Sequence, residues 1–312
     1  MHATRRQFLG SAAGVAYAVR TAAHGMGRQD PTATRLILLG TKGWPRVGSG
    51  GPGNPATLLL IDDVPYVVDC GYGTSLRLLA AGVPLNRVRY IFITHHHSDH
   101  NLEYGSVIYN AWVTGLPMQV DAYGPPGLKQ MTNAFFEYQK FDSDTRISDE
   151  GRPDLRTLVT AHEYSGAGVV LQNEAVTVTA ARVRHSPITH AYALRFDTKD
   201  RSIVMSGDTA YSPELVALAR GADILVHEVM SLAGIDFLLE RVPNAARLRE
   251  HLLASHTLPD DVGKAAAQAG VKTLVLTHFV PPDAPLAEGD WVDGVRRHFS
   301  GRVVFGRDLM EI

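Results

Sequence analysis

Cysteine is almost absent from this 312-residue chain, which contains only Cys70. A single cysteine cannot form an intramolecular disulfide, and it cannot supply a zinc site of the multi-cysteine kind. Any metal site must therefore be built from histidine and carboxylate side chains. The 14 histidines of the chain make such a site possible in principle.

The sequence also lacks an excess of charge of either sign. Its 30 Lys and Arg residues nearly balance 32 Asp and Glu residues, for a formal net charge of -2. This balance gives no general attraction to a phosphate backbone, so nucleic-acid binding would require a local basic patch. With 45% hydrophobic and 20% charged residues, the composition is that of an ordinary globular domain.

Residues 1–28 resemble an export signal. Arg5 and Arg6 precede Phe8 and Leu9, and a short apolar stretch follows. About a dozen apolar residues are too few for a membrane span, which needs about 20. Paired arginines before such a stretch are typical of twin-arginine signals. We predict a periplasmic protein with no stable membrane anchor after signal removal; the competing interpretation is a disordered basic tail.

The rest of the chain alternates apolar strand runs with helical periodicity. Strands are expected at residues 35–39, 56–61, 65–69, 88–94, 155–164, 169–171, 176–183, 192–196, 202–205, 224–226 and 273–277. Helices are expected at residues 74–81, 102–113, 128–141, 213–219 and 259–270 and within 232–254. The acidic, turn-rich residues 141–153 predict a loop. Two β-rich halves that both carry helices indicate two sheets with helices outside, in a single domain over residues 29–312.

The strongest functional signal is residues 94–100, Thr-His-His-His-Ser-Asp-His, at the end of a buried strand. In an extended loop His95 and His97 point to the same side and can bind one metal. Asp99 and His100 can turn toward a second metal. Two metals about 3.5–4 Å apart form a clamp for a displacement reaction at an ester centre. Imidazole and carboxylate ligands suit zinc, with manganese or iron as alternatives.

These local residues cannot complete two metal sites, so further ligands must follow later strands. Three candidates come directly after apolar strands, namely His185, Asp208 and His278. His96 does not fit the ligand pattern, and we expect it to face away from the metals. His162, His251 and His298 are interpreted as surface or hydrogen-bonded histidines.

This set resembles the metallo-β-lactamase superfamily, whose HxHxDH motif is matched by His95, His97, Asp99 and His100. The resemblance spans roughly residues 35–310, in the segments 39–41, 68–74, 91–95, 123–125, 207–209, 227–228, 255–257 and 276–279. It implies an α/β fold, a four-layer αββα sandwich of two mixed sheets with helices outside. It also implies two Zn²⁺ ions per chain, bridged by Asp208, with His185 and His278 completing the two sites.

Within the superfamily, the likeness is to the branch of ribonuclease Z, arylsulfatase and phosphodiesterase enzymes. By that resemblance His256 is a proton donor or charge stabiliser oriented by Glu228, and Asp99 is counted as a catalytic group as well as a ligand. The resemblance further implies that Asp69 accepts a hydrogen bond from a ligand imidazole and holds it in one tautomer.

From these features we expect a di-zinc hydrolase that cleaves a small phosphodiester or aryl sulfate by metal-bound hydroxide. The pocket for an apolar leaving group would draw on Trp44, Tyr104, Trp112 and Phe237. A lactonase or β-lactamase-type acyl hydrolase is the alternative. A binding module that uses metals only to hold its fold is a further alternative, which the retention of Glu228 and His256 disfavours.

A ribonuclease Z-type tRNA 3′ endonuclease ranks behind the small-ester and acyl hydrolases. Residues 141–168, where an RNA-gripping basic arm is expected by resemblance, are acidic and contain no lysine. Electrostatics therefore argue against a polyanionic ligand. Export argues the same way, because tRNA precursors are cytoplasmic. We predict a small-molecule ester as substrate, no nucleic-acid partner, and a homodimer as the candidate assembly.

Overall fold

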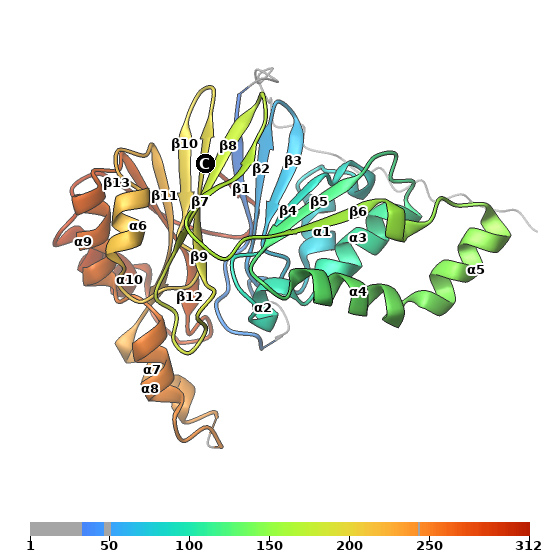
Figure 1. Ribbon diagram of the computed structural model, residues 1–312. Helices are drawn as coiled ribbons and strands as arrows, with labels where there is room; N and C mark the ends of the chain where they lie inside the picture. Colours follow the sequence, from blue (N-terminus) through green and yellow to red (C-terminus); the bar gives the residue numbers. More distant parts are fainter. Residues whose placement is uncertain (1–32, 47–50, 243) are drawn as a thin grey trace, which may run out of the picture. The chain divides into compact units, whose positions relative to one another are not determined.

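Two sheets lie face to face in the computed structural model, which describes residues 33–46, 51–242 and 244–312 (Figure 1). The first sheet has the strand order β14 (Met310–Glu311), β1 (Arg35–Gly40), β2 (Ala56–Ile61), β3 (Val64–Val68), β4 (Tyr90–Phe92), β5 (Val120–Gly124) and β6 (Val159–Glu163). The second has the order β13 (Arg302–Phe305), β12 (Thr273–Val280), β11 (Ile224–Met230), β10 (Ser202–Met205), β9 (Tyr192–Thr198), β8 (Val176–Arg182) and β7 (Gly168–Gln172).

Helices connect the strands along the chain. They are α1 (Thr74–Ala80), α2 (Ser98–Asn101), α3 (Tyr104–Val113), α4 (Leu128–Tyr138), α5 (Lys140–Glu150), α6 (Pro213–Leu218), α7 (Leu232–Leu239), α8 (Leu248–Ser255), α9 (Pro259–Ala269) and α10 (Glu288–Arg296), with 3₁₀ turns at Leu85–Arg87 and Leu155–Thr157. Among the described residues, none of these helices is long and apolar enough to cross a membrane. The export signal predicted over residues 1–28 lies outside the described residues.

Both sheets are mixed. In the first sheet β1, β2 and β3 pair antiparallel, whereas β3, β4, β5 and β6 pair parallel. In the second sheet β7 to β10 pair antiparallel, and β10 to β13 pair parallel. The predicted sandwich of two mixed sheets with helices outside is therefore confirmed.

The continuous apolar strands are explained by burial on both faces. In β2, Leu58 and Leu60 pack on the helix side of the sheet, and Leu59 and Ile61 pack between the two sheets. Every residue of β2 is buried. A period-two alternation of polar and apolar residues would appear only if one face of this strand met water.

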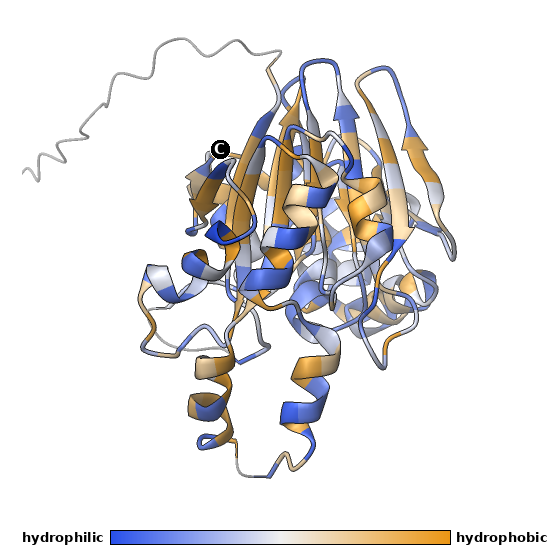
Figure 2. Ribbon diagram, turned by 90° about the vertical axis from the view of Figure 1, so that its left-hand side faces the viewer, coloured by the Kyte–Doolittle hydropathy of each residue, from blue (hydrophilic) through white to orange (hydrophobic). Residues whose placement is uncertain are grey.

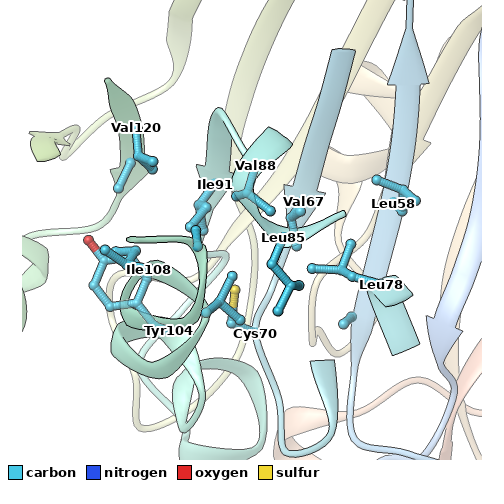
Figure 3. Packing of buried hydrophobic residues seen from close by; sticks show 14 of the residues in the cluster. Leu58, Val67, Cys70, Leu78, Leu85, Val88, Ile91, Tyr104, Ile108 and Val120 are labelled. Carbon is cyan, nitrogen blue, oxygen red and sulfur yellow. The ribbon is translucent and has the colours of Figure 1, made fainter. Parts of the chain in front are cut away.

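Three hydrophobic layers follow from this arrangement. Figure 3 shows the outer layer of the first sheet, where Leu78 of α1 and Tyr104 of α3 pack beside Val67 and Ile91. Cys70 is fully buried in the same layer, and burial raises the pKa of its thiol well above the usual value. A thiol in this state is a poor nucleophile.

The second sheet is covered by α6, α9 and α10, whose apolar side chains form a separate cluster on its outer face. A smaller cluster joins α7 and α8 to Met230 and Val280 at the strand ends. Together α7 and α8 form a hairpin that extends beyond the strand ends (Figure 2). This hairpin brings α8 to the edge of the sandwich where the candidate ligands gather.

One local prediction is wrong, because the residues expected to form a loop at 141–153 form most of helix α5. Ion pairs one turn apart stabilise it, linking Lys140 to Asp144 and Arg146 to both Asp142 and Glu150. The helix ends at Gly151, whose φ of 68° is the left-handed conformation typical of a helix C-terminus. The sequence interpretation also omits β5, α10, β13 and β14.

Candidate metal centre

The histidine-rich segment leaves β4 in extended backbone and then enters the one-turn helix α2. His97 has φ −78° and ψ 148°, so it is extended, and Nε2 of His95 lies 3.1 Å from Nδ1 of His97. Asp99 and His100 follow within the turn and are both buried. The chain changes from extended backbone to helix between these residues. The pair His95 and His97 therefore points to one ligand group, and the pair Asp99 and His100 points to another, as the spacing predicts.

A first group of ligand atoms gathers around His97. Nε2 of His185 lies 3.0 Å from Nδ1 of His97, and Oδ2 of Asp208 lies 3.7 Å from Nε2 of His95. Ligand atoms of these four side chains all lie within 4.8 Å of one another. His95 and His97 follow β4 of the first sheet. His185 follows β8 and Asp208 follows β10 of the second sheet, so the group joins both sheets.

A second group lies on the other side of Asp208. Nε2 of His100 lies 3.1 Å from Nε2 of His278, which is on β12, and Asp99 completes this group. Oδ1 of Asp208 lies 3.2 Å from Nε2 of both histidines. Asp208 thus offers one carboxylate oxygen to each group.

The donor set fits divalent cations. Burial lowers the pKa of His95 well below its usual value and that of His185 to about 4, which keeps both rings neutral, the form that binds metals. Burial also disfavours charge on His100, yet Asp208, Asp69 and Asp99 raise its pKa well above the usual value. An environment that holds positive charge on this ring also favours a cation between the converging ligand atoms.

Hydrogen bonds from outside the groups fix two of these rings. His100 donates from Nδ1 to Oδ2 of Asp69 at 2.8 Å, and His185 donates from Nδ1 to the carbonyl oxygen of Ser255 at 2.9 Å. Asp69 is held in turn by the backbone N–H of Thr94 at 2.9 Å. In both rings Nε2 is left to face the candidate metal position. Asp69 is therefore placed where the resemblance implies.

Backbone in unusual conformations surrounds the site. His278 has a φ of 46° and Asp69 a φ of 61°, in the left-handed region that side chains rarely adopt. A Cβ atom at Gly43 would lie 2.7 Å from Nδ1 of His278, so only glycine fits against this ring. Strained backbone of this kind persists where the surrounding structure fixes it, often at functional sites.

Glu228 and His256 form a buried pair beside the second group. Nδ1 of His256 lies 3.1 Å from Oε1 of Glu228, which also accepts a hydrogen bond from the N–H of Thr209 at 3.0 Å. Burial alone would lower the pKa of His256, but the charge of Glu228 raises it to about 9. His256 also has a ligand atom within 4.8 Å of those of Asp208 and His278.

A pocket of about 220 Å³ opens onto these groups. It is lined by Trp44, Pro45, His97, Ser98, Asp99, Asp208, His251, His256, His278 and Val280. Trp44 has a φ of 95°, and its backbone N–H donates to Oδ2 of Asp99 at 3.1 Å. Of the aromatic residues predicted to line a pocket, Trp44 does so, whereas Tyr104 and Trp112 belong to the core and Phe237 is not part of this lining.

The structure brings together all nine predicted site residues, and their roles as ligands and catalytic groups stay predictions. His96 faces away, with Nε2 3.2 Å from the carbonyl oxygen of Pro126. His251 is the site residue that the sequence interpretation misses, since its ring lies 6.2 Å from that of His97 and lines the pocket. Its position on α8, one helical turn before Ser255, is the signal that would have found it.

The family is decided by a comparison with family models. The model described as "Beta-lactamase superfamily domain" matches residues 65–279, more than half of the chain. The chain belongs to the metallo-β-lactamase superfamily. It is a metal-dependent hydrolase acting on ester bonds, and its histidine and aspartate groups are suited to a divalent metal centre.

Relatives within the superfamily are ribonucleases Z. Ribonuclease Z of Mycobacterium sp. (strain KMS) is 34% identical over 276 residues, covering 85% of this chain and 94% of the relative. The solved human tRNase Z, short form, is 22% identical with a TM-score of 0.66, covering 89% of this chain and 98% of that one. A metallo-β-lactamase fold protein from Bacillus subtilis is 18% identical with a TM-score of 0.65, over 89% and 98% of the two chains. Both solved structures share the fold of this chain.

These relatives overturn the predicted function and partners. A small phosphodiester or aryl sulfate as substrate, and the absence of a nucleic-acid partner, conflict with 34% identity to a ribonuclease over nearly its full length. The charge of the acidic segment 141–168 misled the prediction, although some of its carboxylates pair with arginines of the same segment. Glu150 pairs with Arg146 and Arg152, and Arg156 pairs with both Asp144 and Asp154.

The predicted periplasmic location is wrong, as is the predicted substrate. It rested on the signal-like pattern of residues 1–28, whereas the relatives carry the name of an enzyme that acts on RNA. The arginine pair in residues 1–28 is a short pattern, and a short pattern weighs less than a match that covers 85% of the chain.

Proposed function

We propose that this chain is a ribonuclease Z-type endonuclease that cleaves a phosphodiester bond at the 3′ side of a tRNA precursor. The proposal is carried by one observation, a site of two ligand groups that share Asp208, in a chain similar to ribonucleases Z over 94% of their length. The name of the human structural neighbour, tRNase Z, supports tRNA as the class of RNA.

Two divalent cations, Zn²⁺ in the first instance and Mn²⁺ or Fe as alternatives, would occupy the two groups. His95, His97 and His185 would hold one, Asp99, His100 and His278 the other, with Asp208 shared between them. When bound, the cations supply a Lewis acid and an activated water for attack on phosphorus. Trp44 and Val280 add apolar side chains to the lining of the pocket.

His256 supplies a proton in this proposal. Because Nδ1 is bound to Glu228, its Nε2 is the nitrogen left to meet a substrate oxygen. The raised pKa keeps the ring protonated at neutral pH, as the departing oxygen of a phosphodiester requires. Glu228 is a positioning residue, which fixes the ring and stabilises its charge.

The test is product mapping with a tRNA precursor that carries a 3′ trailer. Protein with its metal content measured is incubated with the end-labelled transcript, beside a sample treated with a chelator. We expect one metal-dependent cut at the junction of the tRNA and its trailer. Full metal content with an intact transcript, or cuts scattered along the RNA, would contradict the proposal.

A further inference from the structure

A second groove adjoins the metal pocket on the face of α8. It has a volume of about 300 Å³ and is lined by Ser186, Pro187, Arg247, Glu250, His251 and Ala254. Nothing in the proposed metal chemistry uses Arg247 or Glu250. The groove therefore calls for a function of its own.

His251 joins this groove to the metal pocket, because its side chain lines both. Its ring lies 6.2 Å from the ring of His97 and 6.4 Å from that of His185. Nδ1 of His251 lies 3.4 Å from Oγ of Ser255, so Nε2 is the nitrogen left to meet a ligand. A chain-like substrate that leaves the metal pocket across His251 enters the groove directly.

The charged groups of the groove match the polar atoms of a ribonucleotide. Arg247 is a guanidinium, the group that pairs best with phosphate oxygens. Glu250 is a carboxylate, and a carboxylate can accept a hydrogen bond from a ribose hydroxyl, as in dinucleotide-binding folds. Ser186 adds an exposed hydroxyl at the groove's edge.

These two side chains are available to a ligand. Nε of Arg247 lies 3.3 Å from Oε2 of Glu250, with side chains 85% and 70% exposed. Ion pairs between side chains this exposed are weak, so either partner can turn to a bound ligand. Their neighbour Arg249 is different, because it pairs with Asp236 on α7 and lines neither pocket.

We propose that this groove is the subsite for the nucleotide next to the scissile phosphate. Arg247 binds the phosphate of that nucleotide, Glu250 accepts a hydrogen bond from its 2′-hydroxyl, and His251 contacts the backbone between the two pockets. The inference rests on the proposed RNA-cleaving function and deepens it. Because the 2′-hydroxyl distinguishes RNA from DNA, Glu250 is a specificity-determining residue at this subsite.

The experiment measures kcat and KM of the metal-loaded enzyme on a tRNA precursor transcript. The transcript is used unmodified and with a single 2′-deoxy substitution at each of the two nucleotides that flank the cut. Arg247→Ala, Glu250→Ala and His251→Ala are compared with Arg249→Ala, a matched control on the same helix. Metal content and helical content are recorded for every variant.

We expect Arg247→Ala and His251→Ala to raise KM for the transcript about tenfold, with a smaller change in kcat and with wild-type metal content. Removing one phosphate contact also lowers the salt dependence of binding by about one released counterion. One of the two 2′-deoxy substrates is cleaved less efficiently by the wild type. Glu250→Ala no longer distinguishes that substrate from the unmodified one.

The inference is overturned if these variants match Arg249→Ala, or if neither 2′-deoxy substitution affects the wild type. A wild-type enzyme that leaves the transcript intact while hydrolysing bis(4-nitrophenyl) phosphate would instead refute the proposed function, and the groove's assignment with it. The reaction of the wild-type enzyme with the unmodified transcript therefore distinguishes failure of the groove assignment from failure of the proposed function.

Discussion

His96 and His97 are adjacent in sequence but have opposite surroundings. His97 lines the metal pocket and lies 3.0 Å from His185, whereas His96 points to the carbonyl of Pro126. We predict that His97→Ala lowers the metal content and reduces turnover at least about 10²-fold, because this ring helps to hold the cation that activates water. Metal analysis and steady-state rates check the prediction. His96→Ala is the matched control, and equal losses in both variants would refute the ligand assignment.

The buried pair of Glu228 and His256 leads to a different pattern of loss. His256→Ala should retain the metals and reduce the rate by about 10² to 10⁴-fold, as expected for a proton donor or charge stabiliser. The ring is charged below a pKa of about 9, so the wild-type rate should fall as the pH rises past this value. Rates from pH 6 to 10, with metal analysis, check both points. Loss of metal in His256→Ala would reassign the residue as a ligand.

At this scale the sequence is informative where ligands are close together along the chain. The alternation of His95 and His97, followed by a turn at Asp99 and His100, depends only on local geometry. The positions of His251 and Arg247 could not be predicted, because they depend on how the hairpin of α7 and α8 packs against the strand ends. The left-handed backbone of Trp44 also depends on distant contacts, with Asp99 and Asn54.

At the scale of elements, Asp223 ties together the starts of three parallel strands. Its Oδ2 accepts hydrogen bonds from the N–H of Ser202 at 2.8 Å and from Oγ of Ser202, and its Oδ1 accepts one from Nζ of Lys272 at 2.6 Å. These residues begin β10 and precede β12, while Asp223 precedes β11. The carboxylate thus links the N-terminal ends of β10, β11 and β12, which lie at the end of the sheet opposite the metal centre.

Asp223→Ala is predicted to lower the free energy of unfolding by about 1–2 kcal/mol at pH 7, because the partly buried donors of Ser202 and the exposed ammonium of Lys272 lose their acceptor. Lys272 and Ser202 lower the pKa of Asp223 to about 2, so the ionised carboxylate stabilises the fold above pH 3.8. The difference between wild type and variant should therefore shrink as the pH falls from about 4 to about 2. Urea unfolding at several pH values measures it, and a difference that persists at pH 2 would contradict this account.

The accuracy of the element predictions follows from how each element is stabilised. Strands β2 and β10 are predicted to the residue because their apolar runs are bounded by polar turns. Helix α5 is missed because ion pairs and not an apolar face stabilise it, and Ser and Asp are common in turns. Strand β12 extends three residues beyond the predicted end at residue 277, since pairing with Met230 of β11 continues past the candidate ligand His278.

For the whole molecule, the metal centre joins the two sheets. His95 follows β4 of the first sheet, whereas Asp208 and His278 belong to the second. A cation that binds only the folded state, present at a concentration 1,000 times its Kd, raises the free energy of unfolding by about 4 kcal/mol. We predict that chelation lowers the Tm by several degrees and abolishes turnover. Calorimetry with and without chelator checks this, and an unchanged Tm in a sample shown to have lost its metal would contradict it.

Whole-molecule properties were also the hardest to predict from the sequence. The net charge of -2 and the acidity of segment 141–168 are sums over residues. They do not say where the charges lie on the folded surface. Ion pairs such as Arg156 with Asp144 offset only part of that charge, and the fold places Arg247 next to the metal pocket. The substrate therefore had to be inferred from relatives and pocket geometry together.

The central claim, that the metal centre serves RNA and not a small ester, is tested most directly by a ratio of specificities. The measurement is kcat/KM of the same metal-counted preparation for a tRNA precursor with a 3′ trailer and for bis(4-nitrophenyl) phosphate. We predict that the precursor exceeds the small diester by at least about 10³-fold, because only the precursor gains binding energy outside the metal pocket. A ratio near one, or a preference for the small diester, would contradict the account.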